Sequence, residues 1–455
     1  MGTIKNGYIF NGLDKQYSFT YDGELLQLVP LNPDEIKSYD FLENRLVEKE
    51  LLNGLTLQKN NIFFLKCRLQ RNISGYIAKP AGYICFDEEV NNFRTMVLRG
   101  EVVNFFYRPN QILSKDSKYS WDEDGGGKLI INKFSEITKH NSVCIAGENV
   151  DFVISISRPT FPEFMVKGYS LGIPKSFIRL EFENDIPIEK FAEIYLWMQN
   201  LFEFVNFRKS VFVEDIELGT FNEEKRISKV AEVYLLHKRE LDLTNPDSVI
   251  GYYFLEKGLN ELLQILNTQN LNMLFLPNTE NEDKYIDPQR YMLCCSSFES
   301  VFNFAFPNAK MSENAKMKAA KDSILEFIDY KDNEYKNKDG AIRKEYKSLK
   351  HLIELADFSL AEKYRWCLNH YKDCVSEYCT RVYQTLKISE EERIKEIPSI
   401  FADKRNVLIH SNIESIEPEE IAAYSIMRYL IYVIILDKSG VPKEMIKSAT
   451  DCILI

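Results

Sequence analysis

The sequence predicts an α+β protein, in which a β-rich N-terminal domain over residues 1–245 precedes an all-α helix bundle over residues 246–455. Short runs rich in β-branched and aromatic residues, separated by turn residues, fill the first part. Apolar residues at helical spacing dominate the second part. A chain of 455 residues with 45% hydrophobic residues can bury more than one core, so the two patterns indicate two domains.

The N-terminal part contains a series of expected strands that favours a sheet sandwich or a barrel. The strand segments are residues 17–32, 60–70, 82–87, 95–107, 128–134, 150–156, 176–182 and 211–218. One helix, from about Pro187 to Phe207, is expected among them because its apolar residues recur every three or four positions.

The C-terminal part predicts a bundle of four or five helices. The first expected helix begins at Pro288, which suits a first-turn position, and continues to Phe306. The others are expected over residues 312–329, 341–386, from about 399, and 418–438. Gly440 is expected to end the last of them.

Arg405, Asn406 and His410 form an R-N-x-x-x-H motif within the run KRNVLIHS. On a helix, Asn406 and His410 are four residues apart and project from one face, and Arg405 is long enough to reach round to them. A neutral histidine can take a proton from a ribose 2'-hydroxyl or return one to a leaving oxygen, and an arginine can hold the charge that builds on a phosphate. The motif is therefore a candidate site for metal-free RNA cleavage.

The spacing alone is not specific, because Arg365 and His370 repeat it in the run RWCLNH. The two runs differ at the second position, where Trp366 stands in one and the polar Asn406 in the other. A purely structural interpretation also stays open. In it, His410 is a satisfied residue at a helix end, and Arg405 forms a surface salt bridge with a nearby acid, either Asp403 or Glu414.

The motif and its helical context resemble the HEPN domain, and the β-rich N-terminal half makes the whole similar to the ApeA-like proteins of bacterial anti-phage defence. The run CSSFESVFNF is similar to the F-E-x-x-F stretch of the first bundle helix in that group. The resemblance covers most of residues 247–455 and is diffuse before them. This sequence departs from many relatives in having Ser411, where they have glycine after the histidine.

The resemblance implies a metal-independent endoribonuclease that cuts RNA in an abortive-infection response, with tRNA as one candidate substrate. Arg405 and His410 would act with Asn406, and Glu299 would be either a supporting acid or an exposed helix residue. The resemblance further implies a homodimer or higher oligomer formed through the bundle, a possible phage-derived trigger, and no cofactor or metal. The alternative is a non-catalytic interaction module attached to a ligand-sensing β-rich domain.

Charge is unevenly distributed along the chain. The formal net charge is −11, of which residues 288–455 carry −1 and the preceding residues −10. Within the second part, the segment from Lys310 to Lys350 is basic. It is either a strip that contacts phosphates or an ordinary solvated helix face.

Two other patterns suggest chemistry and are disfavoured. The run Gly168–Gly172 matches the G-x-S-x-G of serine hydrolases, but Pro174 and a strand follow where the supporting helix should begin. Cys367, His370, Cys374 and Cys379 could suggest zinc, but ligands on a single helix rarely complete a tetrahedron.

The sequence also predicts where the protein resides. The opening residues are polar and strand-like, without the basic and apolar regions of a signal peptide, so secretion is not expected. The most apolar stretch, Tyr429–Leu436, is far shorter than the roughly 20 residues that span a bilayer. The cysteines show no disulfide framework. A cytoplasmic protein that is not inserted in a membrane is therefore expected.

Overall fold

The computed structural model divides the chain into two compact units. The β-rich unit comprises Met1–Thr268, Leu276–Asn281 and Ser439–Ile455, and the helical unit comprises Gln269–Phe275 and Glu282–Lys438. The residues described are 5–10, 13, 15–32, 46–72, 75–87, 90–112, 132–157, 174–213, 215–224, 226–236, 246–269, 271, 273–307, 315–336, 339–355, 359–388, 396–410 and 416–454.

This architecture confirms the α+β class, with a β-rich region followed by a helical one. The boundary between the two units differs in two places from the boundary expected between residues 245 and 246. The short helices that follow residue 246 and the C-terminal segment Ser439–Ile455 both belong to the β-rich unit.

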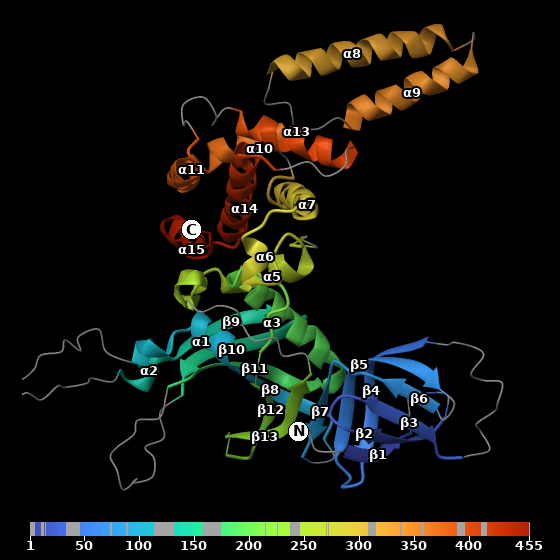
Figure 1. Ribbon diagram of the computed structural model, residues 1–455, viewed down its shortest axis with the longest axis vertical. Helices are drawn as coiled ribbons and strands as arrows, with labels where there is room; N and C mark the ends of the chain where they lie inside the picture. Colours follow the sequence, from blue (N-terminus) through green and yellow to red (C-terminus); the bar gives the residue numbers. More distant parts are fainter. Residues whose placement is uncertain are drawn as a thin grey trace, which may run out of the picture. The chain divides into compact units, whose positions relative to one another are not determined.

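The first strands of the β-rich unit close into a six-stranded antiparallel barrel in the order β4-β1-β2-β3-β6-β5, with β5 paired back to β4 (Figure 1). Phe19 and Tyr21 pack edge to face against Phe64 inside it, with ring centroids 5.3 and 5.4 Å apart. The barrel strands are β1 (Lys5–Ile9), β2 (Tyr17–Tyr21), β3 (Leu26–Pro30), β4 (Leu46–Thr56), β5 (Asn61–Asn72) and β6 (Gly75–Ala78).

The sheet continues from β5 as an open antiparallel sheet in the order β7-β13-β12-β8-β11-β10-β9. Its strands are β7 (Gly82–Phe86), β8 (Asn92–Arg99), β9 (Lys139–Ile145), β10 (Glu148–Ile156), β11 (Ser176–Pro187), β12 (Asp215–Phe221) and β13 (Ile227–Leu235). The expected interrupting helix is confirmed as α3 (Phe191–Val205), preceded by η3 (Ile188–Lys190).

Several expected strands differ from the structure. The segment 95–107 is a strand only as far as Arg99, and α1 (Glu101–Phe106) follows it. Gly100 between them has a φ of 132°, a value that favours glycine and lets the chain turn sharply. Most of the expected strand 128–134 and the whole run Gly168–Gly172 lie outside the described residues.

The remaining helices of the β-rich unit are short, apart from α5 and α15. They are η2 (Pro109–Ile112), α2 (Phe134–Ile137), η4 (Pro246–Ser248), α4 (Tyr252–Leu255), α5 (Leu259–Thr268) and α15 (Lys443–Ile453), while α6 (Glu280–Asp283) spans a boundary between the units. The sequence interpretation did not anticipate α15.

The helical unit confirms the expected helices α7 (Pro288–Ala305) and α14 (Pro418–Lys438). Asp287 caps α7 by accepting a hydrogen bond from the Arg290 amide. The expected helix over 341–386 is instead three helices, α9 (Gly340–Leu355), α10 (Leu360–His370) and α11 (Lys372–Leu386). The other members are α8 (Ala315–Glu334) and α13 (Ile397–His410).

The core of the helical unit is built around α14, whose side chains from Tyr429 to Leu436 are all buried. Helices α7, α11 and α13 pack against α14 (Figure 1). In the described part of the chain, no helix has both the length and the apolar character that crossing a membrane requires.

Candidate functional site

Helix α13 carries the R-N-x-x-x-H motif and is fixed by contacts with α7, α10 and α14. The Phe401 ring lies between those of Tyr291 and Tyr364, at centroid distances of 4.8 and 5.5 Å. One turn later, the Lys404 side chain is only 4% exposed, and its Nζ lies 3.1 Å from a carboxylate oxygen of Glu420 on α14. A buried lysine needs such a partner, so these contacts set the rotation of α13 about its axis.

The next residue, Arg405, reaches helix α7. Its Nη2 donates a hydrogen bond to Oε2 of Glu299 over 3.1 Å, and the two side chains are 32% and 29% exposed. The acid that pairs with Arg405 is therefore Glu299, and no described contact joins Arg405 to Asp403; Glu414 lies outside the described residues. The structure describes the side chains of Arg405, Asn406 and Glu299. It places Arg405 and Glu299 in direct contact.

The guanidinium of Arg405 keeps hydrogen-bonding capacity beyond this ion pair. Arginine carries five N–H donors, and the only contact that the described residues make with them is the one at Nη2. Nε is buried without a hydrogen-bond partner in that same part of the chain. A partly exposed guanidinium that uses one N–H in this ion pair has further donors that can bind a phosphate oxygen.

The outer surface of α13 beyond Arg405 combines one polar side chain with apolar ones. Asn406 is exposed, and Val407 and Ile409 on the same helix are 36% and 51% exposed. The helix ends at His410, whose side chain lies outside the described residues. The structure therefore shows the position of His410 along the helix and not the direction of its imidazole.

Cys295 lies close enough to Arg405 and Glu299 for both charges to act on its thiol. Burial raises the pKa of Cys295 to about 12, while the positive charge of Arg405 acts in the opposite direction and Glu299 reinforces the rise. The thiol is therefore neutral near pH 7 and is not a nucleophile for this site.

The second R-x-x-x-x-H pair has a different environment. Arg365 is exposed, and the His370 ring stacks on Trp366 with centroids 4.7 Å apart and planes at 9°. His370 also packs edge to face on Phe306, at 5.6 Å. No contact among the described residues connects Arg365 or His370 with Arg405 or Glu299. His370 is thus exposed, and the ring contacts described for it are with aromatic side chains.

The structure also places the residues considered for zinc. Cys367 and Cys379 are buried, and burial raises the pKa of the Cys379 thiol to about 12, which disfavours the thiolate that zinc binds. Within the described ranges, His, Cys, Asp and Glu side chains form no cluster of three or more with the spacing of a metal site.

The basic segment from Lys310 to Lys350 is partly neutralised within the α8–α9 hairpin. Arg343 on α9 forms a salt bridge with Asp332 on α8 at 3.1 Å, and Lys350 does so with Asp329 at 2.6 Å. Lys344 and Lys347 are exposed. These pairs favour the interpretation as a solvated helix face for the residues that form them, while Lys336, like Lys344 and Lys347, is exposed to solvent.

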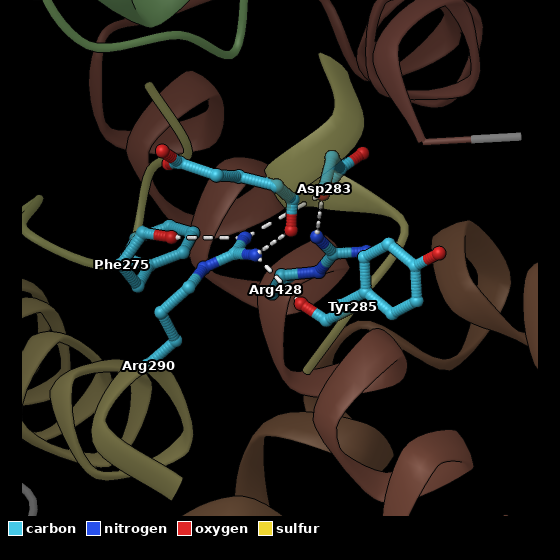
Figure 2. A network of polar contacts seen from close by, with 6 residues as sticks. Phe275, Asp283, Tyr285, Arg290 and Arg428 are labelled. Atoms are coloured by element: carbon cyan, nitrogen blue, oxygen red, sulfur yellow. Dashed lines mark hydrogen bonds and ion pairs between the residues drawn. The ribbon is translucent and has the colours of Figure 1, made fainter. Parts of the chain in front are cut away.

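A polar network that the sequence interpretation missed joins α7, α14 and the segment before α7 (Figure 2). Asp283 accepts from Arg428 at 2.6 Å and lies 3.6 Å from Arg290. Arg290 also donates to the carbonyls of Phe275, Glu282 and Tyr285. A single arginine inside the otherwise apolar run of α14 was the available signal, because a charge in such a run requires a buried partner.

We compared the chain with family models, with curated proteins and with solved structures, and none of the three comparisons gave a match.

Proposed function

We propose that this protein is a metal-independent endoribonuclease of the HEPN type, which acts in a bacterial anti-phage abortive-infection response. The observation that carries the proposal is the Arg405–Glu299 ion pair of 3.1 Å between α13 and α7. It holds a partly exposed arginine directly before the exposed Asn406, on a helix whose last residue is His410. Arg405, Asn406 and His410 are the groups that the chemistry requires.

The proposed reaction is attack of a ribose 2'-hydroxyl oxygen on the adjacent phosphorus. One His410 imidazole takes the hydroxyl proton, the bond from phosphorus to the 5'-oxygen breaks, and a second imidazole donates a proton to that oxygen. Arg405 neutralises charge on the non-bridging oxygens, and Asn406 orients the phosphate. The products are a 2',3'-cyclic phosphate and a 5'-hydroxyl, and DNA is not a substrate because it lacks the 2'-hydroxyl.

Glu299 is the proposed positioning residue. Its carboxylate engages Nη2 of Arg405 and leaves Nη1 for the substrate. It acts through Arg405 and has no direct role in the proton transfers.

A second copy of the chain is the proposed source of the second imidazole. A single histidine cannot readily serve as base and acid on opposite sides of one phosphate, whereas a two-fold dimer supplies two. The exposed Val407 and Ile409 on α13 support this pairing, because apolar side chains on a helix surface favour burial against a partner.

The β-rich unit is proposed to recognise a phage-derived signal in the cytoplasm and to restrain the helical unit until that signal arrives. Cleavage by the intact protein at full rate without a trigger would contradict this part of the proposal and leave the nuclease part standing.

A second candidate function is a non-catalytic interaction module. The same exposed residues, Val407 and Ile409, favour it, because an apolar helix surface binds a partner whether or not a reaction follows. In that case the Arg405–Glu299 pair serves only to fix α13 against α7.

The test incubates the purified full chain with total cellular RNA in EDTA, with and without extract of infected cells, and reads fragment ends for 2',3'-cyclic phosphate. We expect the wild-type chain to cut, and His410→Ala and Arg405→Ala each to cut at least about 100-fold more slowly. The matched control is His370→Ala, the histidine of the second pair, which should cut like the wild type.

The outcomes separate the two candidates. No cleavage by the wild type, even with the extract, would favour the interaction module. Cleavage that survives His410→Ala but is lost in His370→Ala would move the site to α10. A substrate with a 2'-deoxy nucleotide at the cut position should resist cleavage, and its cleavage would contradict the proposed chemistry.

A further inference from the structure

A cavity of about 230 Å³ lies within the β-rich unit, between one face of α3 and the strands opposite it. Phe191, Ala192, Tyr195, Leu196 and Gln199 line it from α3, at positions that share one helical face. Residues Leu65, Lys66, Ala81, Phe212 and Leu235 complete the wall. The cavity thus lies where the closed barrel continues into the open sheet through β5.

The lining is mainly apolar. Leu196 is 47% exposed, although its neighbours on α3 are largely buried. Tyr195 lines the cavity, and its hydroxyl accepts a hydrogen bond from the Val213 amide 3.3 Å away. An apolar wall that remains open to solvent favours an apolar occupant.

The volume limits the size of that occupant. An apolar cavity of about 150 Å³ holds a benzene ring, and drug-sized ligands occupy about 300 Å³ or more. A cavity of about 230 Å³ therefore fits one or two rings or an acyl chain of medium length.

Lys66 is the charged residue among those that line the cavity. Its φ of 45° is in the left-handed region, which is strained for a residue other than glycine. Its neighbours Leu65 and Cys67 are buried and paired with β4, whereas the Lys66 side chain is exposed and contacts no carboxylate of the described residues. Strain of this kind is found preferentially at functional positions.

The charge of Glu203, an acid on α3 close to the lining residue Gln199, is compensated by its own partners. Glu203, which Gln199 approaches at 3.5 Å, accepts a salt bridge from Lys209 at 3.0 Å and a hydrogen bond from the Ser210 amide at 2.8 Å. Its charge is therefore locally compensated.

We propose that this cavity binds a small amphipathic anion, with the ring or acyl body against α3 and the anionic group against the Lys66 ammonium. The site belongs to the β-rich unit alone, so its test does not depend on RNA cleavage.

The test measures calorimetric binding of two anions, octanoate and indole-3-acetate, and of the uncharged octan-1-ol, to the full chain. We expect saturable binding of at least one anion, and about tenfold weaker binding of that anion by Lys66→Gln, with octan-1-ol unaffected. Ala192→Phe, which fills the cavity, should abolish binding, provided that its thermal unfolding remains cooperative.

Lys59→Gln is the matched control. Lys59 is also an exposed lysine of left-handed conformation, with a φ of 67°, but it lies in the β4–β5 turn and does not line the cavity. Its substitution should leave the affinity unchanged. Absence of binding by both anions, equal loss in Lys59→Gln and Lys66→Gln, or unchanged binding in a folded Ala192→Phe would each overturn the proposal.

Discussion

Arg290 and Arg428 project from the packed helices α7 and α14 and share a single carboxylate, that of Asp283 (Figure 2). Both arginine side chains are only 11% exposed. Removing Asp283 would take from both guanidinium groups the carboxylate that they share, at a position where both arginine side chains are largely shielded from water. The carbonyls of Glu282 and Tyr285 would still accept from Arg290, but they carry no charge.

We therefore expect Asp283→Ala to lower the stability of the helical unit by about 3–5 kcal/mol. The measurement is the opening free energy of α14 amides by native-state hydrogen exchange. Asp329→Ala is the matched control, because Asp329 is half exposed and pairs with Lys350 at the surface, so it should cost at most about 1 kcal/mol. Equal effects of the two substitutions would show that the network is not a buried one in solution.

At the same scale, the sequence named candidate site residues but not the residues that contact them. Glu299 was singled out together with Arg405, but local pairing of Arg405 with Asp403 or Glu414 was equally compatible with the sequence. The actual partner lies 106 positions away in the chain. Only the packing of α13 on α7 brings the two together, and sequence spacing carries no information on that packing.

Helices α8 and α9 form an antiparallel hairpin joined by salt bridges (Figure 1). The hydrogen bonds and charge of Arg343 hold the pKa of Asp332 below its ordinary value of 3.8. A carboxyl group whose pKa is lower in the folded state than in the unfolded one stabilises the fold above its unfolded pKa, and this contribution is lost as the pH falls through the folded pKa. The hairpin should thus loosen in acid.

We expect Asp332 to titrate with a midpoint below 3.8 in the wild-type chain and closer to 3.8 in Arg343→Gln. The midpoint can be read from the carboxyl carbon by NMR of chain labelled at aspartate. Lys344→Gln, which removes an exposed neighbouring charge, should shift the midpoint less than Arg343→Gln does. An Arg343→Gln midpoint as low as that of the wild type would show that the salt bridge is not formed in solution.

Two element boundaries were predicted wrongly, one because a local signal was missed and one because packing overrides the local signal. The expected long helix over 341–386 missed a break that the sequence does encode, because Ser359 and Glu362 form a capping box at the start of α10. Val102 and Val103 favoured a strand by their β propensity, but both are buried on α1. Packing of α1 against the sheet therefore overrides the β propensity of these two residues. The sequence alone does not reveal that packing.

The chain passes between its two units more than once, because the last residues return to the unit in which the chain begins. Helix α15 follows α14 directly in sequence, which made it appear part of the bundle. Its buried side chains nevertheless belong to the β-rich unit, where η4 and α4 contact it. The segment that leads into α15 lies close to Gly258. A Cβ atom at Gly258 would be 2.6 Å from the Ser439 carbonyl oxygen, so no side chain fits there.

Truncation after Lys438 should therefore destabilise the β-rich unit and spare the helical one. The lost segment buries Val441, Ile446 and Leu454, and side chains of this size contribute about 1.5–3 kcal/mol each. We expect α3 and α5 amides to lose about 5 kcal/mol of opening free energy by hydrogen exchange, with α14 amides little changed. Ile446→Ala in the intact chain should act in the same direction by about 2–5 kcal/mol. Loss of protection confined to α14 would instead place α15 in the helical unit.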